Sequence, residues 1–192
     1  MTSRSLSWKV SGLVFGAVFA LAGCGPADDG GGSPTGSVTN SASASGVATD
    51  VPAGYNPCTD IPQSVLDSEK LRNRGESNSN ADGGVKWRGC RFGRSDGYVA
   101  SITTTNLTID KTRQRNFADA KEFSVAGRQA ISTRQVADHP EAACVVNVEI
   151  KGGSLDINLS NPPSNRETGQ IDSCVLARTL AEKIVPTMPA SV

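Results

Sequence analysis

The clearest pattern in the chain is an alternation of apolar and polar residues between positions 144 and 159. One side of this segment carries Cys144, Val146, Val148, Ile150, Leu155, Ile157 and Leu159. A period of two is typical of a β-strand with one buried face. Gly152 and Gly153 interrupt the alternation, and glycine accepts the positive φ values that tight turns need. The pattern therefore predicts a β-hairpin that turns at the two glycines.

Further strands are predicted on the amino-terminal side of this hairpin. Residues 85–92 and 98–105 are rich in β-formers, and the second segment alternates clearly. The Asp96-Gly97 dipeptide between them is a strong hairpin signal. Residues 125–136 are strand-like around a turn at Gly127, and residues 76–84 are predicted to be a polar loop.

Three helices complete the pattern. Residues 173–185 place Ala177, Leu180, Ala181 and Ile184 on one face, with Asp172 or Ser173 as the cap and Pro186 as the stop. A short helix is predicted from an N-cap at Asp60 through Val65, Leu66 and Leu71, ending near Gly75. A solvated helix is predicted over residues 107–120. The order α-β-β-α-β-β-β-α indicates the α+β class, a two-layer antiparallel sheet packed by helices.

The first residues have the composition of a targeting segment. Arg4 and Lys9 precede an apolar run over residues 10–22, which is shorter than the roughly 20 residues of a membrane span. The run closes on Leu21-Ala22-Gly23-Cys24, where small residues precede a thiol that can accept a diacylglyceryl group. We therefore expect a lipoprotein signal peptide at residues 1–23 and lipidation of Cys24. The expected location is the extracytoplasmic face of the cell membrane.

A low-complexity stretch follows the lipidation site. Residues 24–54 are rich in Gly, Ser, Ala and Thr and offer little to bury, which is typical of a disordered tether. Residues 55–192 are long enough for one globular domain. The 19 basic and 19 acidic residues of the chain balance, so the sequence lacks the basic excess of a nucleic-acid binder.

Four cysteines lie in the predicted domain: Cys58, Cys90, Cys144 and Cys174. An even number in an exported chain indicates two disulfides, for which three pairings are possible. Cys58–Cys90 with Cys144–Cys174 is favoured, because each bond closes a loop of about thirty residues within its own half. The cysteines are not two to four residues apart, as a structural zinc site requires, so no metal or other cofactor is expected.

Several short motifs together resemble a known family. They are C-x-x-I-P-x-x-V-L at residues 58–66, W-x-x-C-R-F at 87–92, G-R-Q-A at 127–130, C-V-V-N-V at 144–148 and C-V-L-A-x-x-L-A at 174–181. This set resembles domain-of-unknown-function family 3558, a family of actinobacterial lipoproteins that includes mycobacterial members. The resemblance implies an exported, lipid-anchored domain and carries no catalytic residues.

Two features of the sequence match catalytic patterns. Residues 93–97 match the G-x-S-x-G pattern of serine hydrolases, with Ser95 as the nucleophile and His139, the one histidine, as its base. A hairpin turn at Asp96-Gly97 and a solvated loop at His139 explain the same residues without catalysis.

The sequence thus predicts a non-enzymatic, membrane-anchored binding module. Its expected partners are the membrane, through lipid on Cys24, and an envelope protein or an apolar or cell-wall ligand. If it binds a ligand, we expect an apolar pocket of several hundred Å³ between the sheet and the helices. The alternative is a serine hydrolase that uses Ser95 and His139.

Overall fold

The structure is a computed structural model that describes residues 46–117, 119–135 and 139–192. The expected signal peptide, the lipidation site Cys24 and the tether up to residue 45 lie outside the described residues. Within the described ranges, no helix is long and apolar enough to cross a lipid bilayer.

The elements follow one another in this order: α1 (Gln63–Ser68), β1 (Leu71–Glu76), β2 (Ser79–Ala81), the 3-10 helix η1 (Asp82–Gly84), β3 (Val85–Arg94), β4 (Val99–Thr105), α2 (Ile109–Arg113), β5 (Lys121–Val125), β6 (Arg128–Thr133), the 3-10 helix η2 (Pro140–Ala142), β7 (Ala143–Ile150), β8 (Gly153–Ser160), α3 (Ser173–Ile184) and the 3-10 helix η3 (Val185–Thr187).

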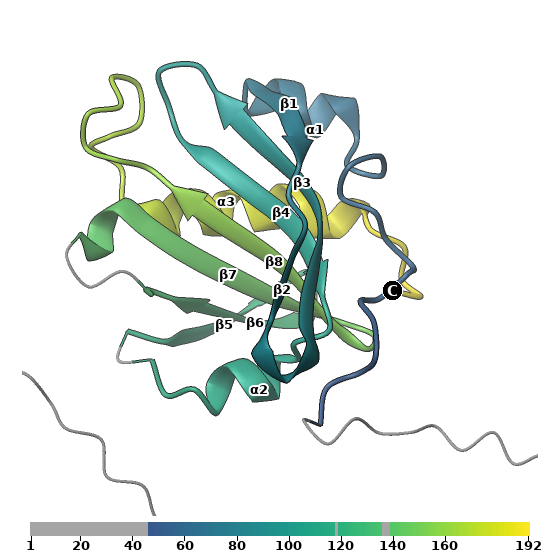
Figure 1. Cartoon of the computed structure of the whole chain (residues 1–192). Coiled ribbons are helices and arrows are strands. Elements are labelled where there is room, and N and C mark those ends of the chain that lie inside the picture. The colour runs from purple at the N-terminus through teal and green to yellow at the C-terminus, as the bar shows by residue number, and fades with distance from the viewer. Residues whose placement is uncertain (1–45, 118, 136–138) are drawn as a thin grey trace, which may run out of the picture. The chain divides into compact units, whose positions relative to one another are not determined.

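In the described part of the chain, eight strands form one antiparallel sheet. Its order is β1-β3-β4-β8-β7-β6-β5, and the short β2 pairs with β3 (Figure 1). The predicted antiparallel sheet with helices and two disulfides is confirmed. The predicted order α-β-β-α-β-β-β-α is wrong, because four strands precede α2 and four follow it.

Three local features of the backbone account for the strands that the sequence pattern does not predict. Lys70 adopts a positive φ of 55°, which ends α1, so Leu71 starts β1 instead of extending a helix. The predicted loop over residues 76–84 contains β2. Residues 121–133 form two strands, because Ala126 and Gly127 both have positive φ and close a tight hairpin between β5 and β6.

Two of the three predicted helices, α1 and α2, are shorter than the pattern predicts. The N-cap of α1 is Pro62 and not the predicted Asp60. The Asp60 carboxylate instead accepts a 2.8 Å hydrogen bond from the backbone N–H of Asn56. α2 covers only Ile109–Arg113 of the predicted residues 107–120. α3 matches its prediction, and the Asp172 side chain caps it by accepting from the backbone N–H groups of Cys174 and Val175.

The predicted hairpin of residues 144–159 is present as β7 and β8. Its turn lies one residue earlier than expected, at Lys151-Gly152, where Gly152 has a φ of 87°. Gly153 is the first residue of β8. An added Cβ there would lie 1.9 Å from the Thr105 carbonyl oxygen, so glycine is required by the close approach of β4.

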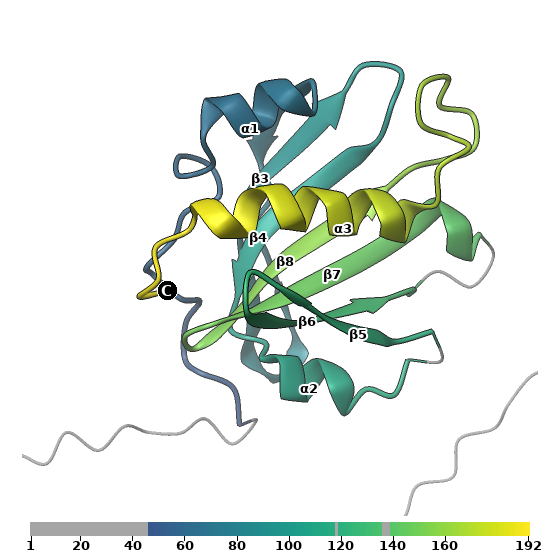
Figure 2. The same cartoon turned by 180° about the vertical axis from the view of Figure 1, so that it is seen from behind.

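The main core lies between the sheet and α3. Figure 2 shows α3 running across one face of the sheet, where it packs on β7 and β8. Its contact residues Ala177, Leu180, Ala181 and Ile184 are fully buried against the apolar side of the strands. We call the opposite side of the sheet the open face.

Residues 46–54, which the sequence assigned to the tether, lie against the sheet. Val47 is buried with Val85 and Leu107 in a small second cluster. The Asn106 side chain donates a 2.6 Å hydrogen bond to the Ala48 carbonyl oxygen. The packed domain therefore starts before the predicted boundary at residue 55.

Candidate functional site

A polar pocket of about 250 Å³ lies on the open face of the sheet. We define it by six of its lining residues: Trp87, Thr103, Phe117, Asn147, Asp156 and Asn158. The alternation that directs apolar side chains of β4, β7 and β8 toward α3 directs polar ones to this side. α2 and the segment after it reach the same side, because Thr112 and Phe117 line the pocket with the strands.

The floor of the pocket is one transverse row of the sheet. Thr103 on β4 pairs directly with Asp156 on β8, and Asp156 pairs directly with Asn147 on β7. Direct cross-strand neighbours have Cβ atoms about 5 Å apart. The register of three strands therefore brings a hydroxyl, a carboxyl and an amide side by side.

Asp156 is a carboxyl group held away from water. It is 8% exposed, and its Oδ2 atom accepts a 2.8 Å hydrogen bond from the Asn147 amide. Burial raises the pKa of Asp156 to about 6, although hydrogen bonds from Asn147 and the Trp87 side chain oppose the rise. The group can therefore change its charge near neutral pH.

Thr103 carries a hydroxyl group with an unused hydrogen-bonding capacity. The residue is 3% exposed, and within the described residues its buried Oγ1 atom has no hydrogen-bond partner. A buried polar group without a partner costs about 1–3 kcal/mol. This arrangement is rare in folded proteins and calls for a specific explanation, such as a functional role or a bound water or ion.

Aromatic and basic side chains form the upper part of the pocket. Trp87 comes from β3, and Phe117 comes from the segment after α2. Arg115, which is exposed, and Asn158 also line it. The site thus combines an acidic floor, a basic group near the surface and two aromatic rings.

The polar pocket differs in chemistry from the apolar pocket that the sequence led us to expect. It lies between the sheet and α2, on the side of the sheet away from α3, and hydroxyl, amide and carboxyl groups make its floor. Apolar alternation identifies Leu155, Ile157 and Leu159 but does not single out Asp156, which lies on the polar side of β8. The available signal was the hairpin register itself, which places Asp156 directly opposite Asn147.

The four domain cysteines form the disulfides favoured from the sequence. Cys58 bonds to Cys90 and ties the segment before α1 to β3. Cys144 bonds to Cys174 and ties β7 to the start of α3. Both bonds lie on the α3 side of the sheet and play no part in the polar pocket.

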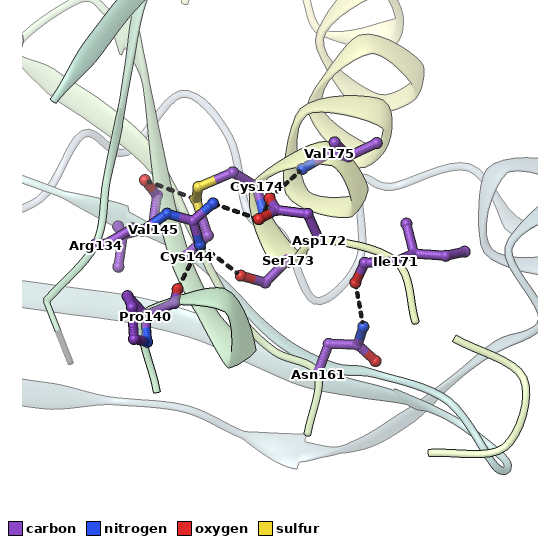
Figure 3. A network of polar contacts seen from close by, with 10 residues as sticks. All are labelled: Arg134, Pro140, Cys144, Val145, Asn161, Ile171, Asp172, Ser173, Cys174 and Val175. Atoms are coloured by element: carbon purple, nitrogen blue, oxygen red, sulfur yellow. Dashed lines mark hydrogen bonds and ion pairs between the residues drawn. A yellow bond between two sulfur atoms is a disulfide. The ribbon is translucent and has the colours of Figure 1, made fainter. Parts of the chain in front are cut away.

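A second polar network surrounds the Cys144–Cys174 bond (Figure 3). The Arg134 guanidinium, just after β6, bonds Asp172 Oδ2 at 2.5 Å and Ser173 Oγ at 3.3 Å, and also donates to the Pro140 carbonyl oxygen. Asp172 is itself the N-cap of α3. Arg134 therefore fixes the start of α3 to the sheet, which is a structural role.

The structure does not bring the candidate hydrolase residues together. Ser95 lies in the loop between β3 and β4, so the G-x-S-x-G segment joins two strands and lacks the helix that a nucleophile elbow needs. His139 precedes η2 and β7, and β7 is two positions from β4 in the sheet, which is about 10 Å at the strand ends. Its side chain is exposed and lies 3.4 Å from Glu141.

No set of three or more His, Cys, Asp or Glu side chains is placed to hold a metal ion in the ranges that the structure describes. Asp156 is accompanied in its row by an amide and a hydroxyl, which suit an organic polar ligand through hydrogen bonds.

These features define an antiparallel-sheet domain with two disulfides and a polar pocket on its open face. The chain belongs to the family described as Protein of unknown function (DUF3558), whose model matches residues 19–187. No curated protein and no solved structure gave a significant match.

Proposed function

We propose that this protein is a lipid-anchored, extracytoplasmic binding module, without catalytic activity, whose polar pocket holds a small polar ligand of the cell envelope. The observation that carries the binding role is the buried Thr103 hydroxyl, which has no partner in the described part of the chain, beside the Asp156 carboxyl. A ligand that completes the hydrogen bonding of these groups recovers their desolvation cost.

The anchoring half of the proposal rests on the sequence before the domain. The apolar run over residues 10–22 and the Leu21-Ala22-Gly23-Cys24 segment support export and lipidation of Cys24. The two disulfides agree with this location, since such bonds persist in oxidising compartments. The pocket favours a small ligand over the envelope protein that the sequence left as an alternative partner.

The anchor is tested by metabolic labelling with a fatty-acid probe. The wild-type protein should be labelled and should fractionate with membranes, whereas Cys24→Ala should lose the label. An unlabelled wild-type protein in the cytosolic fraction would contradict the anchoring half.

The binding half is tested by native mass spectrometry of the full chain purified from the envelope. We expect a small molecule that is released on unfolding. Asn158→Trp should exclude it, because Asn158 lines the pocket from an exposed position on β8. Ser160→Trp is the matched control, since Ser160 is exposed on the same side of the same strand, two residues further along. Wild-type protein without a bound molecule, or equal loss in both variants, would contradict the proposal.

A further inference from the structure

We infer that the ligand of the polar pocket is a neutral polyhydroxylated ring, the chemical class of a monosaccharide unit. This inference rests on the proposed function and specifies the ligand. It follows from the size of the pocket, the donors and acceptors on its floor, the charges around it and its aromatic side chains.

The size of the pocket limits the ligand to one small ring or its equivalent. Its volume of about 250 Å³ holds roughly eight water molecules at ~30 Å³ each. Pockets for drug-sized ligands begin at about 300 Å³. A ring with several hydroxyl groups replaces such waters and reproduces their hydrogen bonds.

The floor demands a ligand that both donates and accepts hydrogen bonds. An ionised Asp156 only accepts, so a ligand group that approaches it must donate. The Thr103 hydroxyl can do both and has no partner among the residues that the structure describes. The two N–H donors of Asn147 are already directed to Asp156 Oδ2 and Ser154 Oγ. Adjacent hydroxyl groups on one ligand match Asp156 and Thr103, which are direct neighbours in the row.

The charges around the pocket favour a neutral ligand. The Asp156 carboxylate repels an anion such as phosphate. A cationic ligand would meet Arg115, which lines the same pocket. Besides Asp156 and Arg115, the lining groups are amides, hydroxyls, aromatic rings and the aliphatic side chains of Leu107 and Val145, all of them uncharged.

The aromatic side chains suit the remaining surface of such a ring. Trp87 and Phe117 line the pocket with aromatic side chains, and Trp87 also carries an indole N–H donor. A pyranose has C–H groups on its faces and hydroxyl groups at its edge. Its faces can pack on the rings while its edge bonds to the floor.

The test is saturation-transfer NMR on the detergent-solubilised full chain. The probes are methyl α-glucopyranoside, methyl α-mannopyranoside and myo-inositol, with ethanolamine, inorganic phosphate and decanoate as cationic, anionic and apolar comparisons. At least one neutral polyol should receive saturation, and the three comparison probes should not. Thr103→Val should weaken polyol binding about tenfold, the effect of one lost hydrogen bond.

Thr104→Val is the matched control for this variant. Thr104 is equally buried on the same strand but faces the other side of the sheet, where its hydroxyl donates to the Arg88 carbonyl oxygen at 3.3 Å. It should leave polyol binding unchanged. The inference is overturned if no polyol binds, if a comparison probe binds instead, or if both variants weaken binding equally. A ligand in native mass spectra that is not polyhydroxylated would overturn this inference and leave the proposed function standing.

Discussion

The Asn147 amide donates a 2.8 Å hydrogen bond to the carboxylate of Asp156, its direct cross-strand neighbour. This bond stabilises the charged form of Asp156 but does not offset burial, which raises the pKa to about 6. The carboxyl group is thus maintained in an unfavourable place by the strands around it. Such a group is more informative about function than an exposed one, because folding alone gains nothing from it.

The raised pKa of Asp156 predicts an unusual dependence of stability on pH. An unfolded aspartate has a pKa near 3.8, so between about pH 4 and pH 6 the folded state binds more protons. Stability from this group is therefore greatest at low pH and is lost as the pH rises through this window, by roughly 3 kcal/mol. Asp156→Asn should remove this loss, which urea unfolding from pH 4 to pH 8 will measure.

Other carboxylates titrate in the same experiment with the opposite sign. Hydrogen bonds lower the pKa of Asp60, and an ion pair with Arg113 lowers the pKa of Glu122. The difference between wild type and Asp156→Asn isolates Asp156. Glu149→Gln, an exposed carboxyl on the same side of β7, should keep the wild-type profile. If the stability of Asp156→Asn depends on pH in the same way as that of the wild type, the raised pKa of Asp156 is contradicted.

The buried hydroxyl of Thr103 predicts a stabilising substitution in the ligand-free protein. Thr103→Val removes a buried polar group that has no partner within residues 46–117, 119–135 and 139–192 and keeps the side-chain shape, so stability should rise by about 1 kcal/mol. Thr104→Val removes a hydroxyl that has an acceptor and should lower stability. Thermal unfolding of both variants checks the signs. Destabilisation by Thr103→Val would indicate that the hydroxyl has a partner in the folded domain.

Gly89 is required by the close approach of β3 and β4 beneath the pocket. An added Cβ would lie 2.2 Å from the Ile102 carbonyl oxygen and 2.8 Å from the Thr103 Cα atom, both of them backbone atoms. Gly89→Ala should therefore cost about 3 kcal/mol and displace Thr103, its direct partner in the register. Urea unfolding will measure the cost.

The control for Gly89 lies on the same strand. At Gly93 an added Cβ would meet side-chain atoms alone, the flexible Arg74 side chain at 3.2 Å from its Nε atom and Val99 Cγ2 at the ordinary contact distance of 3.7 Å. Gly93→Ala should be tolerated with a small change in stability. If Gly89→Ala and Gly93→Ala change the stability equally, the close approach of β3 and β4 at Gly89 does not determine the cost.

Arg134 connects β6, η2 and the start of α3 through one guanidinium group (Figure 3). A lysine cannot donate to Pro140, Asp172 and Ser173 at once, so Arg134→Lys should cost about 1–2 kcal/mol. Hydrogen exchange should increase at the first amides of α3. Arg113→Lys, which affects an exposed ion-pair cluster, is the control and should leave the unfolding midpoint almost unchanged. If the first amides of α3 exchange as slowly in Arg134→Lys as in the wild type, Arg134 does not fix the start of α3 to the sheet.

The sequence predicted the elements whose signals are local. The hairpin of β7 and β8 was found because apolar alternation and a glycine turn coincide there. The disulfide pairing followed from loop length. β1 was missed because Leu71 continues the apolar pattern of α1, and only the positive φ of Lys70 separates the helix from the strand. The predicted helix over residues 107–120 is longer than α2, because no apolar pattern marks where this charged segment stops being helical.

The polar pocket could be predicted only in part. Alternation places Asn147, Asp156 and Thr103 on non-core sides of their strands. Their proximity depends on β8 pairing with β4, a contact between residues more than fifty positions apart. Their burial depends on α2, Trp87 and Phe117 covering the same side. Long-range pairing of this kind leaves no periodic signal in a single sequence.

The most direct test of the account is a crystal structure of the full chain purified from the envelope without added ligand. We predict density for a bound molecule within hydrogen-bonding distance of Thr103 Oγ1 and the Asp156 carboxyl. A pocket that holds only water, or one closed by neighbouring side chains that partner Thr103, would contradict the assignment of this row as a binding site.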